Sequence, residues 1–260
     1  MARPKFGISM LYCLGEPFRK MVDRLAETSA EYVEVVDDGF HELDNRRVSV
    51  LREIGVSHGL KYSVHAPFAD VNIASPSYRL RRVMLKRLEQ SIRHARALDA
   101  YVWVFHPGLK TGISSFYPGV DWLQNLKSIQ ALSKIAGDCG VNIAIENVPE
   151  PYPGLMKSVK DFEEFYAQFS GDVGMVLDVG HSNVNGQTES FIRAFSDKIV
   201  HMHLSDNDGG SDQHLGIGHG DVDWNRLAGL MKNMEYDKTA VIECVEHVEE
   251  SLERLRQLFV

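Results

Sequence analysis

Acidic and histidine side chains gather between residues 173 and 220 at spacings that suit a metal site. Two short apolar runs, 173–179 and 199–204, carry such residues at their ends, and a glycine-rich loop follows. The motifs are Asp178-x-x-His181, His201-x-His203 and Asp212-x-His214. Imidazole and carboxylate ligands suit Zn, Mn, Fe or Co, and these motifs offer no soft thiolate. The stretch therefore predicts a site for a divalent cation.

The elements that must position these residues follow a regular alternation of strand-like and helix-like patterns. The expected strands are 5–11, 32–36, 62–65, 101–105, 142–146, 173–177, 199–204 and 239–244. The expected helices are 17–30, 45–58, 77–98, 122–139, 159–169, 189–195, 224–233 and 248–259, with Asp121 as the cap of the fourth. Strands that alternate with helices indicate a parallel sheet. Eight such pairs predict an α/β chain with one domain over residues 1–260, a single (β/α)8 TIM barrel.

In barrels of this kind the working side chains lie at the C-terminal ends of the strands. Six successive expected strands carry a histidine or an acidic residue at this end. These residues, together with those of the adjoining loops, are His65, His106, Glu146, Asp178, His181, His203, Asp212, His214 and Glu243. A single one would often be only a hydrogen-bonded structural residue, but coincidence is a poor account of the whole set. The pattern predicts a metal site that holds one to three ions.

Four other sets of polar residues have less certain roles. Glu34 is an inward-facing residue of the second expected strand, where it could contact the substrate, support a metal ligand or form an internal salt bridge. His201 faces the same side of its strand as His203 and is expected to pack behind it. His219 lies in the glycine-rich loop and is a candidate for substrate contact. The histidines expected to be solvated are His41, His58, His94 and His247.

Composition bounds the class of protein and its partners. The 44% hydrophobic and 25% charged residues are typical of a soluble globular chain, and the three distant cysteines do not suggest a disulfide framework. The net charge of −8 disfavours a nucleic-acid partner. No apolar run is long enough to span a membrane, and the first residues lack the pattern of a signal peptide. We therefore expect a cytoplasmic protein with no membrane partner.

Taken together, the motifs resemble the xylose isomerase-like barrel superfamily, which includes sugar and sugar-phosphate isomerases and epimerases and also endonuclease IV. The resemblance covers essentially the whole chain. It rests on His65-Ala66-Pro67, Phe105-His106-Pro107-Gly108, Glu146-Asn147, Leu177-Asp178-x-x-His181, His201-x-His203-Leu204-x-Asp206, Asp212-x-His214-x-x-x-Gly218 and Ile242-Glu243. Each motif is weak alone, and the combination is specific to the superfamily.

The isomerase and epimerase branch implies one divalent metal held by two Glu, one Asp and one His. On this chain those ligands would be Glu146, Asp178, His203 and Glu243. The implied chemistry is proton transfer next to a carbonyl through a metal-stabilised enediolate, with Glu146 and Glu243 as the catalytic acid and base. His181 would orient a substrate hydroxyl. The substrate would be a small sugar, a polyol derivative or a sugar phosphate.

The endonuclease IV branch implies three zinc ions and cleavage of a phosphodiester at abasic DNA. Its additional ligands would match His65, His106, His181, Asp212 and His214. Three features depart from that branch. The segment after Glu146 is rich in proline where the nuclease has glycine and serine, Val179-Gly180 stands where it has Thr-Cys, and the loop 206–220 is acidic and lacks Lys and Arg.

The first hypothesis is therefore a metal-dependent isomerase or epimerase with a small carbohydrate substrate. The alternatives are an endonuclease IV-type phosphodiesterase and a barrel that keeps its metal for ligand binding. The cofactor is one to three divalent ions chosen from Mn, Zn, Co, Fe and Mg. A homo-oligomer is expected only by analogy with the family.

Overall fold

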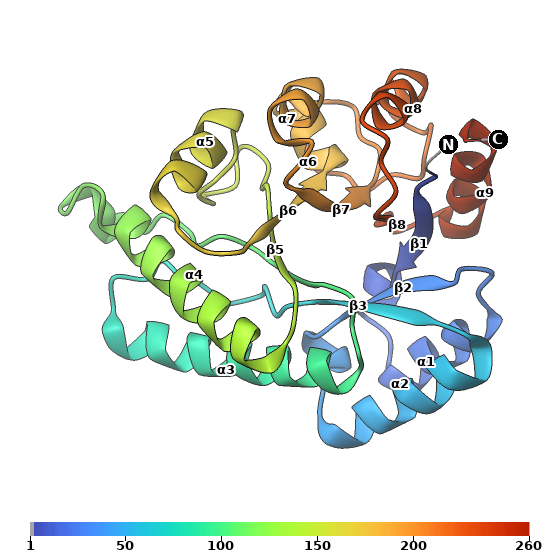
Figure 1. Ribbon diagram of the computed structural model, residues 1–260, viewed down its shortest axis with the longest axis horizontal. Coiled ribbons are helices and arrows are strands. Elements are labelled where there is room, and N and C mark those ends of the chain that lie inside the picture. Colours follow the sequence, from blue (N-terminus) through green and yellow to red (C-terminus); the bar gives the residue numbers. More distant parts are fainter. Residues whose placement is uncertain (1–2, 260) are drawn as a thin grey trace.

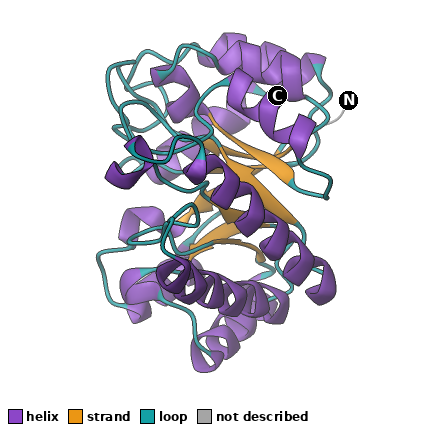
Figure 2. Ribbon diagram, turned by 90° about the vertical axis from the view of Figure 1, so that its left-hand side faces the viewer, coloured by secondary structure: helices purple, strands orange, loops and turns teal. Residues whose placement is uncertain are grey.

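The computed structural model describes residues 3–259, and its eight parallel strands close into one barrel wrapped by helices (Figure 1, Figure 2). Each strand pairs with its neighbours in chain order, and β8 pairs with β1. The strands are β1 (Lys5–Ser9), β2 (Tyr32–Val36), β3 (Lys61–His65), β4 (Trp103–Phe105), β5 (Ile143–Glu146), β6 (Gly174–Asp178), β7 (Ile199–Leu204) and β8 (Thr239–Ile242). The predicted single (β/α)8 barrel is confirmed.

The helices cover the outside of the barrel, as the predicted alternation requires (Figure 2). They are α1 (Phe18–Glu27), α2 (Asn45–His58), α3 (Tyr78–Ala97), α4 (Val120–Cys139), α5 (Val159–Gln168), α6 (Val179–Val184), α7 (Thr188–Phe195), α8 (Trp224–Asn233) and α9 (Val248–Leu258). Short 3-10 helices occur at Met10–Cys13, Gly39–His41 and Gly112–Ser115. No helix within residues 3–259 is long and apolar enough to cross a membrane.

Two details of the helices differ from the sequence prediction. The prediction that Asp121 caps α4 is wrong, because the helix begins at Val120 and Gly119 is the N-cap residue in a left-handed conformation, with φ of +82°. Asp121 lies in the first turn instead and is buried. The short helix α6 was not expected as a separate element. It begins because the Asp178 side chain accepts a hydrogen bond from the His181 backbone N–H.

Alternation along each strand separates an apolar outer surface from an interior that holds both apolar and polar side chains. Trp103 and Phe105 of β4 belong to the main core that packs against the helices, whereas Val104 between them belongs to a small cluster inside the barrel. Ala144 and Val176 of β5 and β6 belong to the same inner cluster. The residues two positions further along those strands, Glu146 and Asp178, therefore also face inward.

Strand register brings inward residues of neighbouring strands together. Asp178 of β6 is paired with His203 of β7, and His201 is paired with Thr239 of β8. On the other side of the barrel Glu34 of β2 is paired with Ser63 of β3. These pairs form two polar levels, one at the strand ends and one directly below it.

The loops after β4 and β5 join to form one wall at the C-terminal end of the barrel. Leu109 and Gly154 form an antiparallel bridge, and the Gly108 carbonyl accepts a hydrogen bond from the Leu155 backbone. A Cβ at Gly108 would lie only 2.3 Å from that of Ala74, so this close approach needs glycine. The Asn125 side chain accepts the Gly108 N–H at 2.8 Å and fixes the turn that follows His106.

Candidate metal centre

Four ligand-type side chains meet at the ends of β5, β6, β7 and β8, and we call them the inner group: Glu146, Asp178, His203 and Glu243. All four are buried, and one potential ligand atom from each lies within 4.8 Å of the others. His203 Nδ1 is 3.1 Å from Glu146 Oε1, 3.1 Å from Glu243 Oε2 and 3.8 Å from Asp178 Oδ2. The structure thus brings together the four residues that the resemblance singled out.

The donor atoms of the inner group fit a divalent cation. Glu146 Oε2 and Asp178 Oδ2 are buried and have no hydrogen-bond partner among the described residues. A buried carboxylate oxygen without a donor is unfavourable, because water no longer compensates its charge. A cation bound by three carboxylates and one imidazole would supply that compensation, and this mixed oxygen and nitrogen set suits Mn, Co, Fe or Zn.

Two further ligand groups surround the inner one. The first outer group consists of His65, His106 and the shared Glu146, whose Oε2 lies 3.4 and 3.2 Å from the two Nε2 atoms. The second outer group consists of His181, Asp212 and His214, and Asp212 Oδ2 lies 3.2 Å from each Nε2 atom. The sequence-predicted ligands other than Glu34 therefore fall into three adjacent groups, and Glu34 belongs to a further ligand-type group with His201 and His203.

Backbone carbonyls fix the orientation of three outer histidines. His65 Nδ1 lies 2.8 Å from the Ala66 carbonyl, His181 Nδ1 2.8 Å from the Asn147 carbonyl, and His214 Nδ1 2.6 Å from the Glu243 carbonyl. A carbonyl oxygen can only accept, so each Nδ1 carries the hydrogen. Each Nε2 then faces its carboxylate partner and is available as a ligand once it is deprotonated.

Asn147 connects the inner group to the second outer group by hydrogen bonds, and no role was predicted for it from the sequence. Its side-chain oxygen accepts the Asp178 N–H at 2.8 Å, and its amide donates to the Asp178 carbonyl at 3.1 Å. The backbone carbonyl of Asn147 accepts a hydrogen bond from His181 Nδ1. The only sequence signal was its position next to Glu146. The strand pairing that brings Asn147 beside Asp178 could not be seen in the sequence.

The carboxylates raise the pKa values of three outer histidines, whereas burial lowers the pKa of the fourth, His106. Burial disfavours the imidazolium of His65, but Glu146 outweighs burial and raises its pKa to about 9. At His181, Asp178 and Asp212 outweigh burial and raise the pKa to about 10. At His214, Asp212 and Glu243 outweigh burial and raise the pKa to about 9. Burial raises the pKa of Asp178 to about 7. Metal-free protein therefore holds protons where cations would bind.

Seven residues of the ligand groups form the floor of a cavity of about 470 Å³, namely His65, His106, Glu146, His181, Asp212, His214 and Glu243, whereas Asp178 and His203 do not line it. Its other walls are mostly apolar and include Leu11, Val36, Phe68, Val148, Pro149, Pro151 and Tyr152, together with the charged Glu150. Phe68 packs edge-on against His65, with ring centroids 5.4 Å apart. None of the residues that line the cavity is Lys or Arg. The sequence analysis missed this wall, because loop residues show no periodic pattern.

A larger cavity of about 1000 Å³ opens at the opposite end of the barrel. Its lining includes Lys5, Lys61 and Lys238 but none of the three ligand groups. Two of these lysines are paired with neighbouring acids, Lys61 with Glu31 and Lys238 with Asp237. We therefore place the chemistry in the smaller cavity, where ligands and orphaned carboxylate oxygens coincide.

The remaining candidates lie outside that cavity. Glu34 and His201 are fully buried below the inner group and contact each other. The His219 side chain is 40% exposed and stacks on His247, with ring centroids 4.4 Å apart. The expectation that His41 is solvated is wrong, because it is buried with Nε2 3.0 Å from the Glu16 carbonyl.

One of the acidic loop residues is structural. The carboxylate of Asp206 accepts hydrogen bonds from the backbone N–H groups of Gly218 and Val222 and from the indole of Trp224. Asp206 is fully buried, so it shapes the loop after β7 and does not face the cavity.

Comparison with known proteins identifies the family. The model of the xylose isomerase-like TIM barrel family matches residues 22–258. The chain belongs to this family. It is 30% identical over 249 residues to an uncharacterized protein of Methanocaldococcus jannaschii, covering 92% of this chain and 83% of that protein. It is also 19% identical over 254 residues to a D-psicose 3-epimerase of Ruminiclostridium cellulolyticum, covering 92% and 83% of the two chains.

Among solved structures, a D-tagatose 3-epimerase-like protein superposes with a TM-score of 0.91. The two chains are 28% identical, and the match covers 98% of this chain and 96% of the other. This family member therefore shares nearly the whole barrel with the protein described here.

Proposed function

We propose that the protein is a divalent-metal-dependent epimerase or isomerase of a small sugar. The observation that carries the proposal is the inner group, in which two buried glutamates that line a sugar-sized cavity cluster with a buried aspartate and a buried histidine. The similarity to chains named D-psicose 3-epimerase and D-tagatose 3-epimerase-like supports the reaction class. Zinc, manganese and cobalt all suit this donor set.

The two glutamates are proposed to move the proton. Glu146 and Glu243 reach the floor from β5 and from the end of β8, and both approach His203 Nδ1 to 3.1 Å from different strands. One takes the proton from the carbon next to the carbonyl, and the other returns a proton to that carbon. A bound cation would polarise the carbonyl and neutralise the negative charge that develops on its oxygen.

The outer groups are proposed to contact the substrate while a single cation is bound. The Nε2 atoms of His65, His181 and His214 face the cavity floor and can hydrogen-bond to sugar hydroxyls. The walls offer Phe68 and Tyr152 to the apolar face of a sugar. Because the lining contains no Lys or Arg, the cavity favours an uncharged sugar over a sugar phosphate.

The test is solvent hydrogen exchange at the carbon next to the carbonyl. Protein loaded with Mn²⁺ or Co²⁺ is incubated in D2O with a panel of ketoses, including D-psicose, D-tagatose and L-ribulose and their phosphates, and NMR follows the deuterium. We expect an epimer with deuterium at that carbon from at least one unphosphorylated ketose. No exchange in any ketose, with metal bound, would refute the proposal, and exchange only in phosphates would refute the uncharged substrate.

One observation favours a second candidate, a multi-zinc phosphodiesterase acting at abasic DNA. The three ligand groups share or adjoin Glu146 and could hold three ions. The cavity nevertheless lacks the cationic side chains that a DNA backbone needs, and the net charge is −8. We expect zinc-replete protein to leave abasic duplex DNA intact at low salt. Efficient incision would reverse the order of the two candidates.

A further inference from the structure

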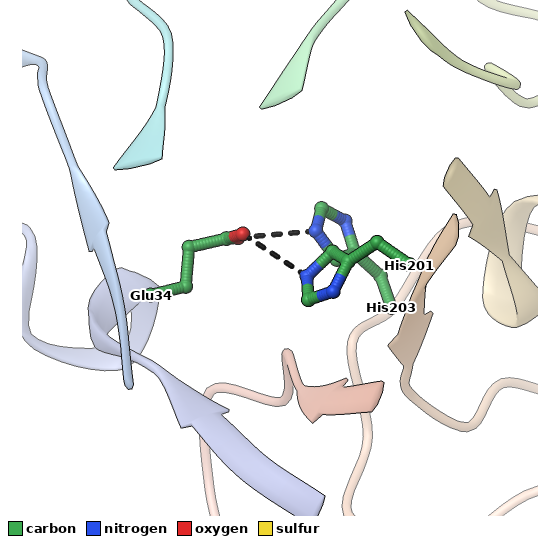
Figure 3. Close-up of side chains that lie close together, drawn as sticks. All are labelled: Glu34, His201 and His203. Carbon is green, nitrogen blue, oxygen red and sulfur yellow. Dashed lines mark ion pairs between the residues drawn. The ribbon is translucent and has the colours of Figure 1, made fainter. Parts of the chain in front are cut away.

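A second polar level lies directly below the inner group, inside the barrel. Figure 3 shows the Glu34 side chain reaching across the interior from β2 toward two imidazoles of β7. Glu34 Oε1 lies 3.0 Å from His203 Nε2, and Glu34 Oε2 lies 3.2 Å from His201 Nε2. All three side chains are fully buried, so water does not screen these contacts.

The Glu34 carboxylate is held in place from the strand beside it. Ser63 is its partner in the β2–β3 register, and the Ser63 hydroxyl donates to Glu34 Oε2 at 3.0 Å. The Tyr101 hydroxyl in turn donates to Ser63 Oγ at 3.1 Å. These hydroxyls orient the carboxylate independently of any metal.

The opposite side of the level is fixed in a similar way. His201 is the register partner of Thr239, and its Nδ1 lies 2.7 Å from Thr239 Oγ1. The Thr239 hydroxyl can donate to Nδ1, which leaves Nε2 of His201 to carry a hydrogen toward Glu34. The register of two strand pairs therefore sets the position of Glu34 and His201.

Carboxylates lie beside both ring nitrogens of His203. Nδ1 faces Glu146 and Glu243, each at 3.1 Å, and Nε2 lies 3.0 Å from Glu34 Oε1. A cation bound at Nδ1 would use the lone pair of that nitrogen, and the ring hydrogen would then be on Nε2, where the nearby charge of Glu34 stabilises it. His203 therefore presents Nδ1 to the inner group, whereas His65, His181 and His214 present Nε2 to the cavity floor.

We propose that Glu34 is a positioning residue, which holds His203 in the tautomer whose Nδ1 binds the cation of the inner group. The inference rests on the proposed metal role of that group. Three of the outer histidines, His65, His181 and His214, are oriented by backbone carbonyls, which no substitution removes. His203 is oriented by a side-chain charge, which also makes the imidazole a stronger donor to a metal. Glu34 thus acts on metal affinity without touching the substrate.

The test replaces Glu34 with its uncharged isostere. In Glu34→Gln we expect the inner group to bind Co²⁺ about 10- to 100-fold more weakly, as calorimetric titration would measure, because outer partners of metal-bound histidines contribute on that order. Long-range ¹H–¹⁵N NMR of the zinc-loaded wild type should show the hydrogen of His203 on Nε2. The KM for the sugar at saturating metal should change little.

Three further variants make the test specific. Glu31→Gln removes an exposed glutamate that pairs with Lys61 near the start of the same strand, and it should leave metal affinity unchanged. Ser63→Ala and Tyr101→Phe retain the Glu34 charge but remove the hydroxyls that hold it. They should weaken Co²⁺ binding less than Glu34→Gln does, and they keep the test decisive if that variant does not fold.

Three results would overturn the inference. One is a His203 hydrogen on Nδ1 in the zinc-loaded wild type. Another is unchanged Co²⁺ affinity in folded Glu34→Gln or in both hydroxyl variants. The third is the loss of one ion per chain from Glu34→Gln with unchanged affinity for the rest, which would make Glu34 itself a ligand. Wild-type protein that binds metal but turns over no sugar would contradict the proposed function and leave this inference standing.

Discussion

The inner group and the outer groups contain the same residue types, but the fold holds them differently. The inner residues lie on strands or directly after one, and their side chains are at most 5% exposed. Among the outer residues, His106, His214 and Asp212 lie on loops, and their side chains are 20 to 25% exposed. A rigid, buried set of ligands favours one permanently bound ion, whereas ligands on loops favour exchange with solvent.

The difference suggests a division of labour within one cavity. Under the proposed function, the inner group would hold the cation and supply the two proton-transfer glutamates, and the outer groups would bind either sugar hydroxyls or additional ions. Glu146 is the exception, because it belongs to both the inner group and the first outer group.

Glu146→Gln should have the largest effect. It removes a charge from two ligand groups and a proton-transfer group from the floor, so we expect turnover to fall by about 10²–10⁴ and inner-group metal affinity to fall as well. Steady-state kinetics and calorimetric titration would measure the two effects. The matched control is Glu253→Gln, an exposed glutamate of α9, which should retain full activity. Wild-type turnover in Glu146→Gln would remove the residue from the mechanism.

Two isosteric substitutions compare an inner with an outer aspartate. Asp178→Asn should lower turnover about 100-fold or more through loss of the cation, although it retains the oxygen that caps α6. Asp212→Asn should lower turnover less than about tenfold, because it changes only contacts to hydroxyls or to additional ions. Equal losses in the two variants would show that the inner and outer groups act as one unit.

Excess zinc should distinguish the role of the second outer group from that of the inner group. Zinc ions that occupy the second outer group would displace the sugar from His181 and His214, so we expect zinc beyond one equivalent to inhibit wild-type turnover. Asp212→Asn should reduce that inhibition, because it removes the carboxylate between the two histidines. Zinc titrations of activity in both proteins would measure this. Stimulation by the second and third zinc equivalents would contradict it.

The pH dependence of metal binding should be steeper for the outer group. Metal-free His181 and His214 have pKa values of about 10 and 9, so below these values each must lose a proton before a cation binds. Affinity at the second outer group should therefore rise up to about 100-fold per pH unit between pH 7 and 9, since two protons are displaced. In the inner group Asp178, with a pKa of about 7, is already largely ionised above neutrality, and His203 remains to be deprotonated.

We therefore expect each ion that binds to the inner group above pH 7 to displace about one proton. Each ion that binds to the second outer group should displace about two. Lowering the pH should therefore release outer ions before inner ones. Calorimetry in buffers of different ionisation enthalpy would count the protons. Equal proton counts for the two groups would contradict the assignment.

The sequence predicted those parts of the molecule that depend on local pattern. The alternation of strand and helix patterns predicted the barrel, and the rule that active residues lie at the strand ends identified all members of the inner and outer groups. The sequence did not predict features that depend on register and close approach. Three such features arise only when distant strands pair. They are the hydrogen bonds between Asn147 and Asp178, the backbone carbonyls that bind the outer histidines, and the contact of Glu34 with His203.

Asp121 shows why a local pattern can also mislead. An aspartate before an apolar helical pattern is a common N-cap, but Gly119 takes the left-handed turn two residues earlier and lets the helix begin at Val120. The cavity wall was missed for a related reason. Phe68 and Tyr152 lie on loops whose course is set by contacts such as the Leu109–Gly154 bridge, which no periodicity reveals.

The most direct test of the central claim is sugar turnover against equivalents of Co²⁺ added to metal-free protein. The account predicts that activity rises linearly and reaches its maximum at one equivalent per chain, bound at the inner group, while Glu146→Gln remains inactive throughout. A maximum that requires two or three equivalents would contradict the account, because the outer groups would then hold ions that the reaction needs.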